Sequence, residues 1–187
     1  RPGANGMIGV ELASKAPPDG YTIVVGTTGA LCMNVSIYAK VPYDPVKDFA
    51  PISNFAESAF ILSVHPSVPA TTIKELIALA KAQPNKLTYA TFGVGSSAHL
   101  GTELFSMLTG IKMVHVPYNG SVPATTDLVA GQVMLSLDSM QSAMPLIRTK
   151  RLRGLGLAAA KRSPAAPDIP TIAEAGVPGF EVGSWYG

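Results

Sequence analysis

Short apolar runs alternate along this chain with segments in which apolar residues recur every three or four positions. The runs are typical of buried strands and cover residues 22–26, 60–64, 87–91, 112–116, 133–137 and 152–157. The segments of helical spacing cover residues 10–13, 30–38, 73–82, 97–109, 121–129 and 140–148, and a last short helix is expected from Thr171 to Gly176. Strands that alternate with helices in this way predict an open α/β sheet with parallel strands.

The segment from Leu87 to Leu108 carries the most informative local pattern. A strand leads into the turn Gly93-Val94-Gly95-Ser96-Ser97, and a helix follows with leucines at 100, 104 and 108 on one face. The first N–H groups of a helix have no partner within it and point together, so they can hold a small anion without a charged side chain. This turn is therefore the first candidate binding site.

Small polar residues also follow other predicted strands. In an open α/β sheet, ligands bind beyond the carboxyl ends of the strands. None of these ends carries a cluster of catalytic residue types, so the pattern favours a binding cleft. The polar strand ends are Thr27-Thr28, Ser96-Ser97, Tyr118-Asn119-Gly120 and Asp138-Ser139.

The sequence allows two roles for the acidic residue Asp138. It either caps the following helix together with Ser139 or contacts a ligand. A carboxylate facing the cleft would accept a hydrogen bond from a ligand ammonium group, or repel a second ligand carboxylate.

Composition limits the partners. Only 14% of the 187 residues are charged, against about 25% in ordinary soluble domains, and the formal net charge is +2. The densest basic cluster is Arg148, Lys150, Arg151 and Arg153, which is too sparse to indicate a nucleic-acid partner. Cys32 is the single cysteine, and no apolar run reaches the 18 residues that a membrane span needs, so no membrane insertion is expected.

The sequence contains partial matches to three kinds of reactive or cofactor-binding site. Gly93-x-Gly95-x-x-Ala98 matches a dinucleotide fingerprint, but the next strand ends without the acidic residue that would hold the ribose. The order Gly-x-Gly-Ser-Ser is not the Gly-x-Ser-x-Gly of a hydrolase nucleophile. His65, His99 and His115 lack metal-ligand spacing. No cofactor or metal is expected, and an α/β oxidoreductase or hydrolase that uses the Gly93–Ser97 turn as an anion site remains the alternative.

Several longer motifs carry a family resemblance that runs from Arg1 to Gly187. They are Arg1-Pro2-Gly3-Ala4, Pro18-Asp19-Gly20-Tyr21-Thr22, Tyr43-Asp44-Pro45, His115-Val116-Pro117-Tyr118, Gly131-Gln132-Val133 and Pro167-Asp168-x-Pro170-Thr171. In order and spacing the chain resembles the Bug-type extracytoplasmic receptors associated with tripartite tricarboxylate transporters.

The resemblance implies a periplasmic binding protein-like, type II, two-lobed Venus-flytrap fold. Residues 1–59 would form part of the first lobe, residues 60–181 the second, and residues 182–187 would return to the first. Members of this family begin and end with further elements, so the first lobe is expected to be incomplete here and to expose core surface.

The resemblance also implies a function. The chain would be a non-enzymatic periplasmic receptor that captures a small carboxylate: a di- or tricarboxylate, an acidic amino acid or an aromatic carboxylate. Its partners would be membrane transporter subunits or a sensor protein. The ligand-binding positions carried over are Thr27, Thr28, Gly95, Ser96, Ser97, Tyr118, Asn119, Gly120 and Asp138.

Overall fold

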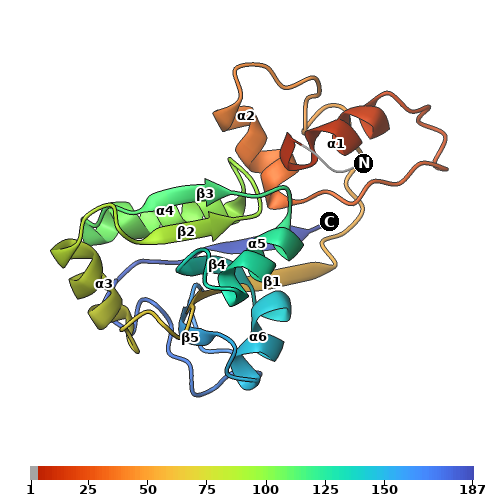
Figure 1. Cartoon of the computed structure of the whole chain (residues 1–187). Helices are drawn as coiled ribbons and strands as arrows, with labels where there is room; N and C mark the ends of the chain where they lie inside the picture. The colour runs from red at the N-terminus through yellow and green to blue at the C-terminus, as the bar shows by residue number, and fades with distance from the viewer. Residues whose placement is uncertain (1–3) are drawn as a thin grey trace.

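A mixed β-sheet forms the centre of the molecule, with strands in the order β3-β2-β4-β1-β5 and β6 paired to the first half of β1 (Figure 1). The computed structural model describes residues 4–187. The strands are β1 (Ala56–Val64), β2 (Thr88–Thr91), β3 (Val114–Pro117), β4 (Leu135–Ser139), β5 (Arg153–Leu157) and β6 (Gly183–Tyr186).

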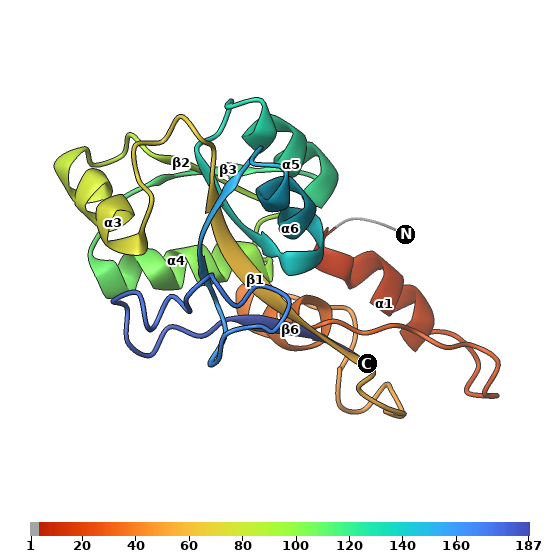
Figure 2. The ribbon, with the colours of Figure 1, turned by 90° about the horizontal axis from the view of Figure 1, so that it is seen from below.

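Helices cover both faces of this sheet (Figure 2). On one face Ile73 and Leu76 of α3 and Phe105 of α4 are buried in the main apolar core, and on the other Leu128 of α5 and Ala143 of α6 pack in two smaller clusters. The helical elements are η1 (Ala4–Gly6), α1 (Met7–Ser14), η2 (Gly29–Met33), α2 (Asn34–Ile37), α3 (Ile73–Ala82), α4 (Ser97–Thr109), α5 (Ser121–Val129) and α6 (Met140–Arg148).

The α/β class predicted from the sequence is confirmed, but the expectation of an all-parallel sheet is wrong. Strand β2 is parallel to β3 and β4, whereas β1 is antiparallel to both β4 and β5. The apolar run Phe60-Ile61-Leu62 fits a central strand buried on both faces, and such a run does not encode the direction of the strand. Because β1 is reversed, residues 60–64 run antiparallel to β4, and Phe60 in the middle of β1 pairs with Ser139 at the carboxyl end of β4.

The strand expected at residues 22–26 is absent. The segment is extended but forms no ladder, and Ile23 and Val25 are exposed. Only its end is paired: Gly26 exchanges two backbone hydrogen bonds with Gly187, of 2.7 and 3.2 Å. Its apolar composition suits a strand, but within residues 4–187 the end of β6 pairs here only with Gly26 and Thr27, and residues 22–25 pair with no strand.

The helix α4 buries a different face from the one predicted. Leu100 and Leu108 are 36% and 46% exposed, while Ala98, Gly101 and Phe105 face the sheet. A Cβ atom on Gly101 would lie 2.7 Å from Cδ2 of Leu137. Small residues therefore allow this helix to approach β4 closely, and close packing determines the buried face more than the spacing of the leucines does.

The segment at residues 171–176 also differs from the prediction, since it is a turn and not a helix. The hydroxyl of Thr171 still accepts a hydrogen bond from the N–H of Glu174, at 3.0 Å. The capping interaction is followed by a single α-turn, in which the N–H of Ala175 donates to the carbonyl of Thr171 at 2.9 Å, but the turn does not continue into a helix.

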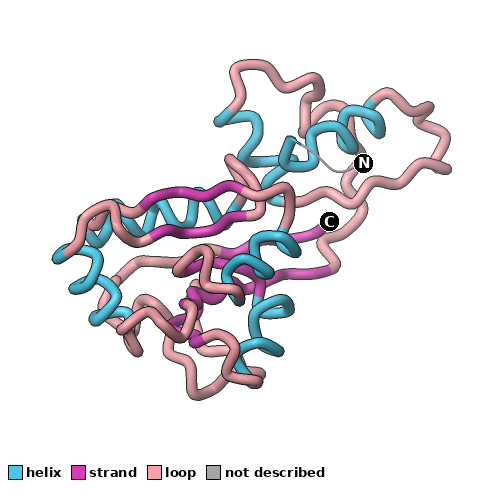
Figure 3. The backbone as a smooth tube through the Cα atoms, viewed as in Figure 1, coloured by secondary structure: helices cyan, strands magenta, loops and turns pink. Residues whose placement is uncertain are grey.

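The N-terminal segment, residues 4–55, consists of helices and loops (Figure 3). Its small core contains Val10, Ala30 and Tyr43. Strands β1 and β6 join it to the sheet, through register pairs from Ala56–Tyr186 to Ala59–Gly183. The division into lobes at residues 60 and 182 stays a prediction. Among the described residues, none of the helices has both the length and the apolar character needed to cross a membrane.

Candidate functional site: a cavity at the strand ends

A cavity of about 1100 Å³ lies between the N-terminal segment and the edge of the sheet where β2, β3 and β4 end. The sequence places polar residues at these same strand ends. The cavity wall consists of Asn5, Gly6, Thr27, Gly29, Tyr38, Phe60, Phe92, Gly93, Val94, Ser97, Pro117, Tyr118, Asn119, Gly120, Ser121, Asp138, Ser139, Ser142, Ser184 and Tyr186.

The turn Gly93–Ser97 forms one side of the cavity and starts α4. Gly93 and Gly95 have φ angles of 150° and 77°, which residues with a Cβ atom rarely adopt. The hydroxyl of Ser96 donates to the carbonyl of Gly93 at 2.6 Å and accepts from the N–H of His99 at 3.3 Å. Ser96 is 1% exposed and acts as the helix N-cap.

Ser97, the first residue of α4, lies in the cavity wall. Within residues 4–187, no carbonyl or side chain accepts a hydrogen bond from the backbone N–H groups of Ser97 and Ala98. These two N–H groups begin a helix of 13 residues and carry the positive end of its dipole. They can therefore hold an anionic oxygen.

Gly95 lies behind the wall and connects the turn to the N-terminal segment. Its carbonyl accepts a hydrogen bond from the Asn5 amide at 3.1 Å, and its N–H donates to Nδ1 of His99 at 3.2 Å. Next to this contact, the hydroxyl of Ser97 lies 3.7 Å from the sulfur of Met33. The two sides of the cavity thus meet at the turn.

The two threonines of the N-terminal segment have separate positions. Thr27 lies in the cavity wall, and its hydroxyl accepts from the N–H of Ala30 at 3.2 Å. Thr28 lies outside the wall, where its hydroxyl accepts from the N–H of Trp185 at 2.9 Å. Thr28 therefore fixes β6 against the start of η2.

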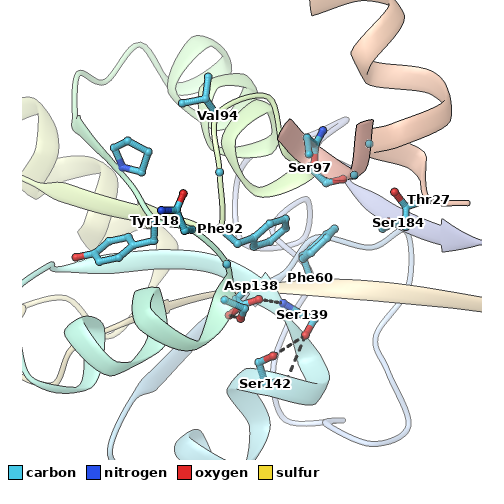
Figure 4. A pocket seen from close by; sticks show the side chains of 18 of the residues that line it. Thr27, Phe60, Phe92, Val94, Ser97, Tyr118, Asp138, Ser139, Ser142 and Ser184 are labelled. Carbon is cyan, nitrogen blue, oxygen red and sulfur yellow. Dashed lines mark hydrogen bonds between the residues drawn. The ribbon is translucent and has the colours of Figure 1, made fainter. Parts of the chain in front are cut away.

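Asp138 lies at the end of β4 in the cavity wall and is buried (Figure 4). Its carboxylate accepts from the hydroxyl of Ser121 at 2.7 Å, that of Thr125 at 3.2 Å and the N–H of Ser139 at 2.7 Å. Burial raises the pKa of the Asp138 carboxyl, while these three hydrogen bonds act in the opposite direction. The carboxylate ties the start of α5 to the end of β4.

Ser121 does not cap α5, although its position at the start of the helix would suit a cap, because its hydroxyl donates to Asp138 and Gly120 is the N-cap. Ser139 caps α6, because its hydroxyl accepts from the N–H of Ser142 at 3.3 Å. Helices α4, α5 and α6 therefore all begin at the cavity.

Tyr118, Asn119 and Gly120 follow β3 and lie in the wall as well. The phenol of Tyr118 donates to Asp127 at 2.7 Å. Burial, and then this hydrogen bond, raise the pKa of Tyr118 to about 12, so it stays protonated at neutral pH. The structure thus gathers six of the predicted positions in the wall (Thr27, Ser97, Tyr118, Asn119, Gly120 and Asp138), while Thr28, Gly95 and Ser96 support it from behind.

The aromatic part of the wall, Phe60 and Phe92, is not among the binding positions predicted from the sequence. Phe60 and Phe92 stack with ring centroids 6.3 Å apart and an angle of 26° between the rings (Figure 4). Phe92 directly follows the last residue of β2, a position that alone would have indicated it. Phe60 was assigned only to a strand, because a parallel β1 would place it at the opposite edge of the sheet.

His99 and His115 lie behind the turn and do not form a metal site. Their rings stack with centroids 4.1 Å apart, and the ring of Tyr89 stacks on His115. Burial lowers the pKa of His115, and the charge of His99 acts in the same direction. No group of three possible metal ligands occurs in the part of the chain that the structure describes.

An α/β fold with a polar cavity at the strand ends is compatible with a solute-binding receptor, and the comparisons specify the family. The profile of the tripartite tricarboxylate transporter family receptors, TctC, matches residues 1–187. The chain belongs to this family. The resemblance stated from the sequence is confirmed, and the matched family is one of transporter receptors and not of enzymes.

Individual relatives agree with this assignment. A protein in the tcbD-tcbE intergenic region of Pseudomonas sp. strain P51 is 42% identical over 100% of this chain and 56% of its own length. The structure of R. palustris Rpa4515 with adipate is 41% identical, with a TM-score of 0.95 over 100% of this chain and 62% of that one.

Two further structures are MatC from Rhodopseudomonas palustris with bound malate (34% identity, TM-score 0.90, 99% and 63% covered) and the periplasmic binding protein BugD (32%, 0.92, 100% and 62%). The chain therefore spans a little over half the length of the curated relatives that it matches, and about three fifths of the solved ones.

Proposed function

We propose that the protein is a periplasmic receptor that captures a small carboxylate in the cavity and delivers it to the membrane subunits of a tripartite transporter. Membership of the receptor family supports the role, and the relatives solved with adipate and with malate support the ligand class. The binding positions are those of the cavity wall, with Ser97 as the first contact.

The observation that carries this proposal is the unpartnered start of α4. The N–H group of Ser97 supplies a hydrogen-bond donor at the positive end of the helix dipole in the cavity wall, and the N–H of Ala98 follows it in the same turn. No Lys or Arg lies in the described wall, so backbone N–H groups at helix starts are its candidates for anion binding.

The test uses the native full-length protein and isothermal titration with adipate, malate, citrate and benzoate. Ser97→Pro removes one N–H at the first helical position, where proline fits a helix, and Ser96 already has the extended backbone that precedes proline (φ −69°, ψ 162°). We expect the variant to lose about 2 kcal/mol of binding free energy for the carboxylates that bind.

Ser97→Ala is the matched control, because it removes the hydroxyl and keeps the N–H. We expect the alanine variant to bind within about threefold of the native protein, and thermal unfolding of both variants checks that α4 remains folded. Equal affinities of the proline and alanine variants would reject the role of this N–H, and no binding of any carboxylate by the native protein would reject the receptor function.

A further inference from the structure

The aromatic pair Phe60–Phe92 brings two apolar rings into the cavity wall, which anion binding alone does not require. Phe60 comes from β1 and Phe92 from the loop after β2, and the two rings belong to the cavity wall. Phe60 is 3% exposed, whereas Phe92 is only partly buried and packs against the edge of the main core. The pair thus brings an apolar surface into a site that the strand ends otherwise make polar.

Polar groups lie on both sides of this pair. Ser97, at the start of α4, lies on one side, and Asp138 and Ser139, at the start of α6, lie on the other (Figure 4). Val94 and Pro117 extend the apolar surface. A ligand held by a carboxylate at α4 therefore lies with the rest of its body over the rings.

The groups around the rings determine which ligands fit, according to the part of the ligand that extends from the carboxylate. An aromatic face cannot replace the hydrogen bonds that a hydroxyl or a second carboxylate makes with water, so placing such a group over it costs free energy. Asp138 is the only ionisable acidic or basic side chain in the described wall besides the tyrosines, and its ionised form repels a second carboxylate nearby. An aryl ring or a methylene chain placed over the pair meets neither obstacle and buries apolar surface against it. A long methylene chain can also carry a second carboxylate beyond the rings and Asp138, which the short body of malate cannot do.

We propose that Phe60 and Phe92 determine specificity, selecting carboxylates with an aromatic or methylene body over hydroxylated ones. The proposal rests on the carboxylate receptor function and narrows its ligand class. Phe92 is the residue to vary, since Phe60 belongs to the core and its loss would destabilise the sheet.

The experiment measures dissociation constants of the native full-length protein for benzoate, adipate, malate and citrate by isothermal titration. We expect benzoate, adipate or both to bind at least about tenfold more tightly than malate and citrate, a difference of about 1.4 kcal/mol. In Phe92→Asn we expect the ratio of the dissociation constants, malate or citrate over benzoate or adipate, to fall to about one. The reason is that the aromatic or methylene ligand binds more weakly to this variant. In Phe92→Leu the preference for adipate over malate stays within about threefold of the native value, because leucine keeps an apolar surface.

Phe55→Ala serves as the matched control, because Phe55 is 65% exposed and lies outside the cavity wall. Its binding profile is expected to equal that of the native protein. The native profile tests the proposal independently of any variant. Malate or citrate binding as tightly as adipate and benzoate overturns the specificity role while the receptor function stands. Binding of none of the four overturns both.

Discussion

Asp138 shows how one buried carboxylate can organise the cavity while opposing the stability of the fold. Three donors surround it, from Ser121, Thr125 and the N–H of Ser139. Desolvation is the larger effect, and it raises the pKa of the carboxyl above its ordinary value of 3.8. The folded protein therefore binds this proton more tightly than the unfolded chain does.

The consequence is a stability change with a definite sign. As the pH rises from the ordinary pKa through the raised one, the unfolded chain has already lost the proton and the folded protein still holds it, so the free energy of unfolding falls. Asp138→Asn removes this contribution. We expect the difference in unfolding free energy, variant minus native, to increase with pH across this window, measured by urea denaturation at several pH values.

Other carboxyls with lowered pKa values, such as Asp44, Glu75 and Glu174, contribute the opposite slope, but they are present in both proteins and cancel in the difference. A difference that stays constant with pH would show that the pKa of Asp138 is not raised. A Thr126→Ala variant is a suitable control, since Thr126 lies on the same helix and its hydroxyl bonds only the carbonyl of Val122.

Individual residues also show how much of the site could be predicted from the sequence. The polar residues at the strand ends were predicted by their positions alone, because strands β2, β3 and β4 end at one edge. Two hydroxyl roles were not predictable: Thr28 and Ser121 each bond to protein groups that only the folded chain brings near. Phe60 could not be placed, because its location depends on the direction of β1.

At the scale of elements, α4 owes its position to the absence of a side chain at Gly101. A Cβ atom there would lie 2.7 Å from Leu137 and 3.0 Å from Val182. Gly101→Ala gains about 1 kcal/mol of helix propensity but introduces overpacking that costs about 1–3 kcal/mol. We expect the variant to lose about 1 kcal/mol of unfolding free energy in urea denaturation.

A double-variant cycle separates these two effects. Leu137→Val shortens the side chain that the new methyl group meets, so Gly101→Ala in that background should be less damaging by at least about 0.5 kcal/mol. A single Gly101→Ala variant that is more stable than the native protein would contradict the packing argument.

The same scale explains which elements were predicted correctly. Helices α3 and α4 begin at Thr72 and Ser96, whose hydroxyls accept from Glu75 and His99 as their capping positions indicate. These capping signals lie within the first residues of each helix, so the sequence shows them without knowledge of the fold. The expected strand at residues 22–26 and the apolar face of α4 depend on neighbours, and periodicity alone does not identify neighbours.

For the whole molecule, the distribution of apolar surface is uneven. In the N-terminal segment five large apolar side chains are at least 65% exposed: Tyr21 (93%), Ile23 (75%), Val46 (84%), Ile52 (83%) and Phe55 (65%). In the rest of the described chain only Met107 (72%) and Val122 (79%) are as exposed. We expect the isolated 187-residue chain to bind an apolar fluorescent dye and to self-associate, because exposed apolar surface of this kind favours both.

The measurement is dye fluorescence together with light scattering, compared with the native full-length protein. Replacement of Ile23, Ile52 and Phe55 by serine should reduce the dye signal of the 187-residue chain. A monodisperse chain with one cooperative melting transition and no dye binding would contradict the expectation.

The pairing of β1 with β6 has a mechanical consequence. Four register pairs, from Ala56–Tyr186 to Ala59–Gly183, join the N-terminal segment to the sheet as a two-stranded ribbon. Sliding one strand along the other by a single residue would break these pairs and turn every side chain of that strand to the opposite face. Bending and twisting leave the pairs intact. Such a ribbon resists shear and yields to torsion, so a rotation of the N-terminal segment about it would keep the β1–β6 register.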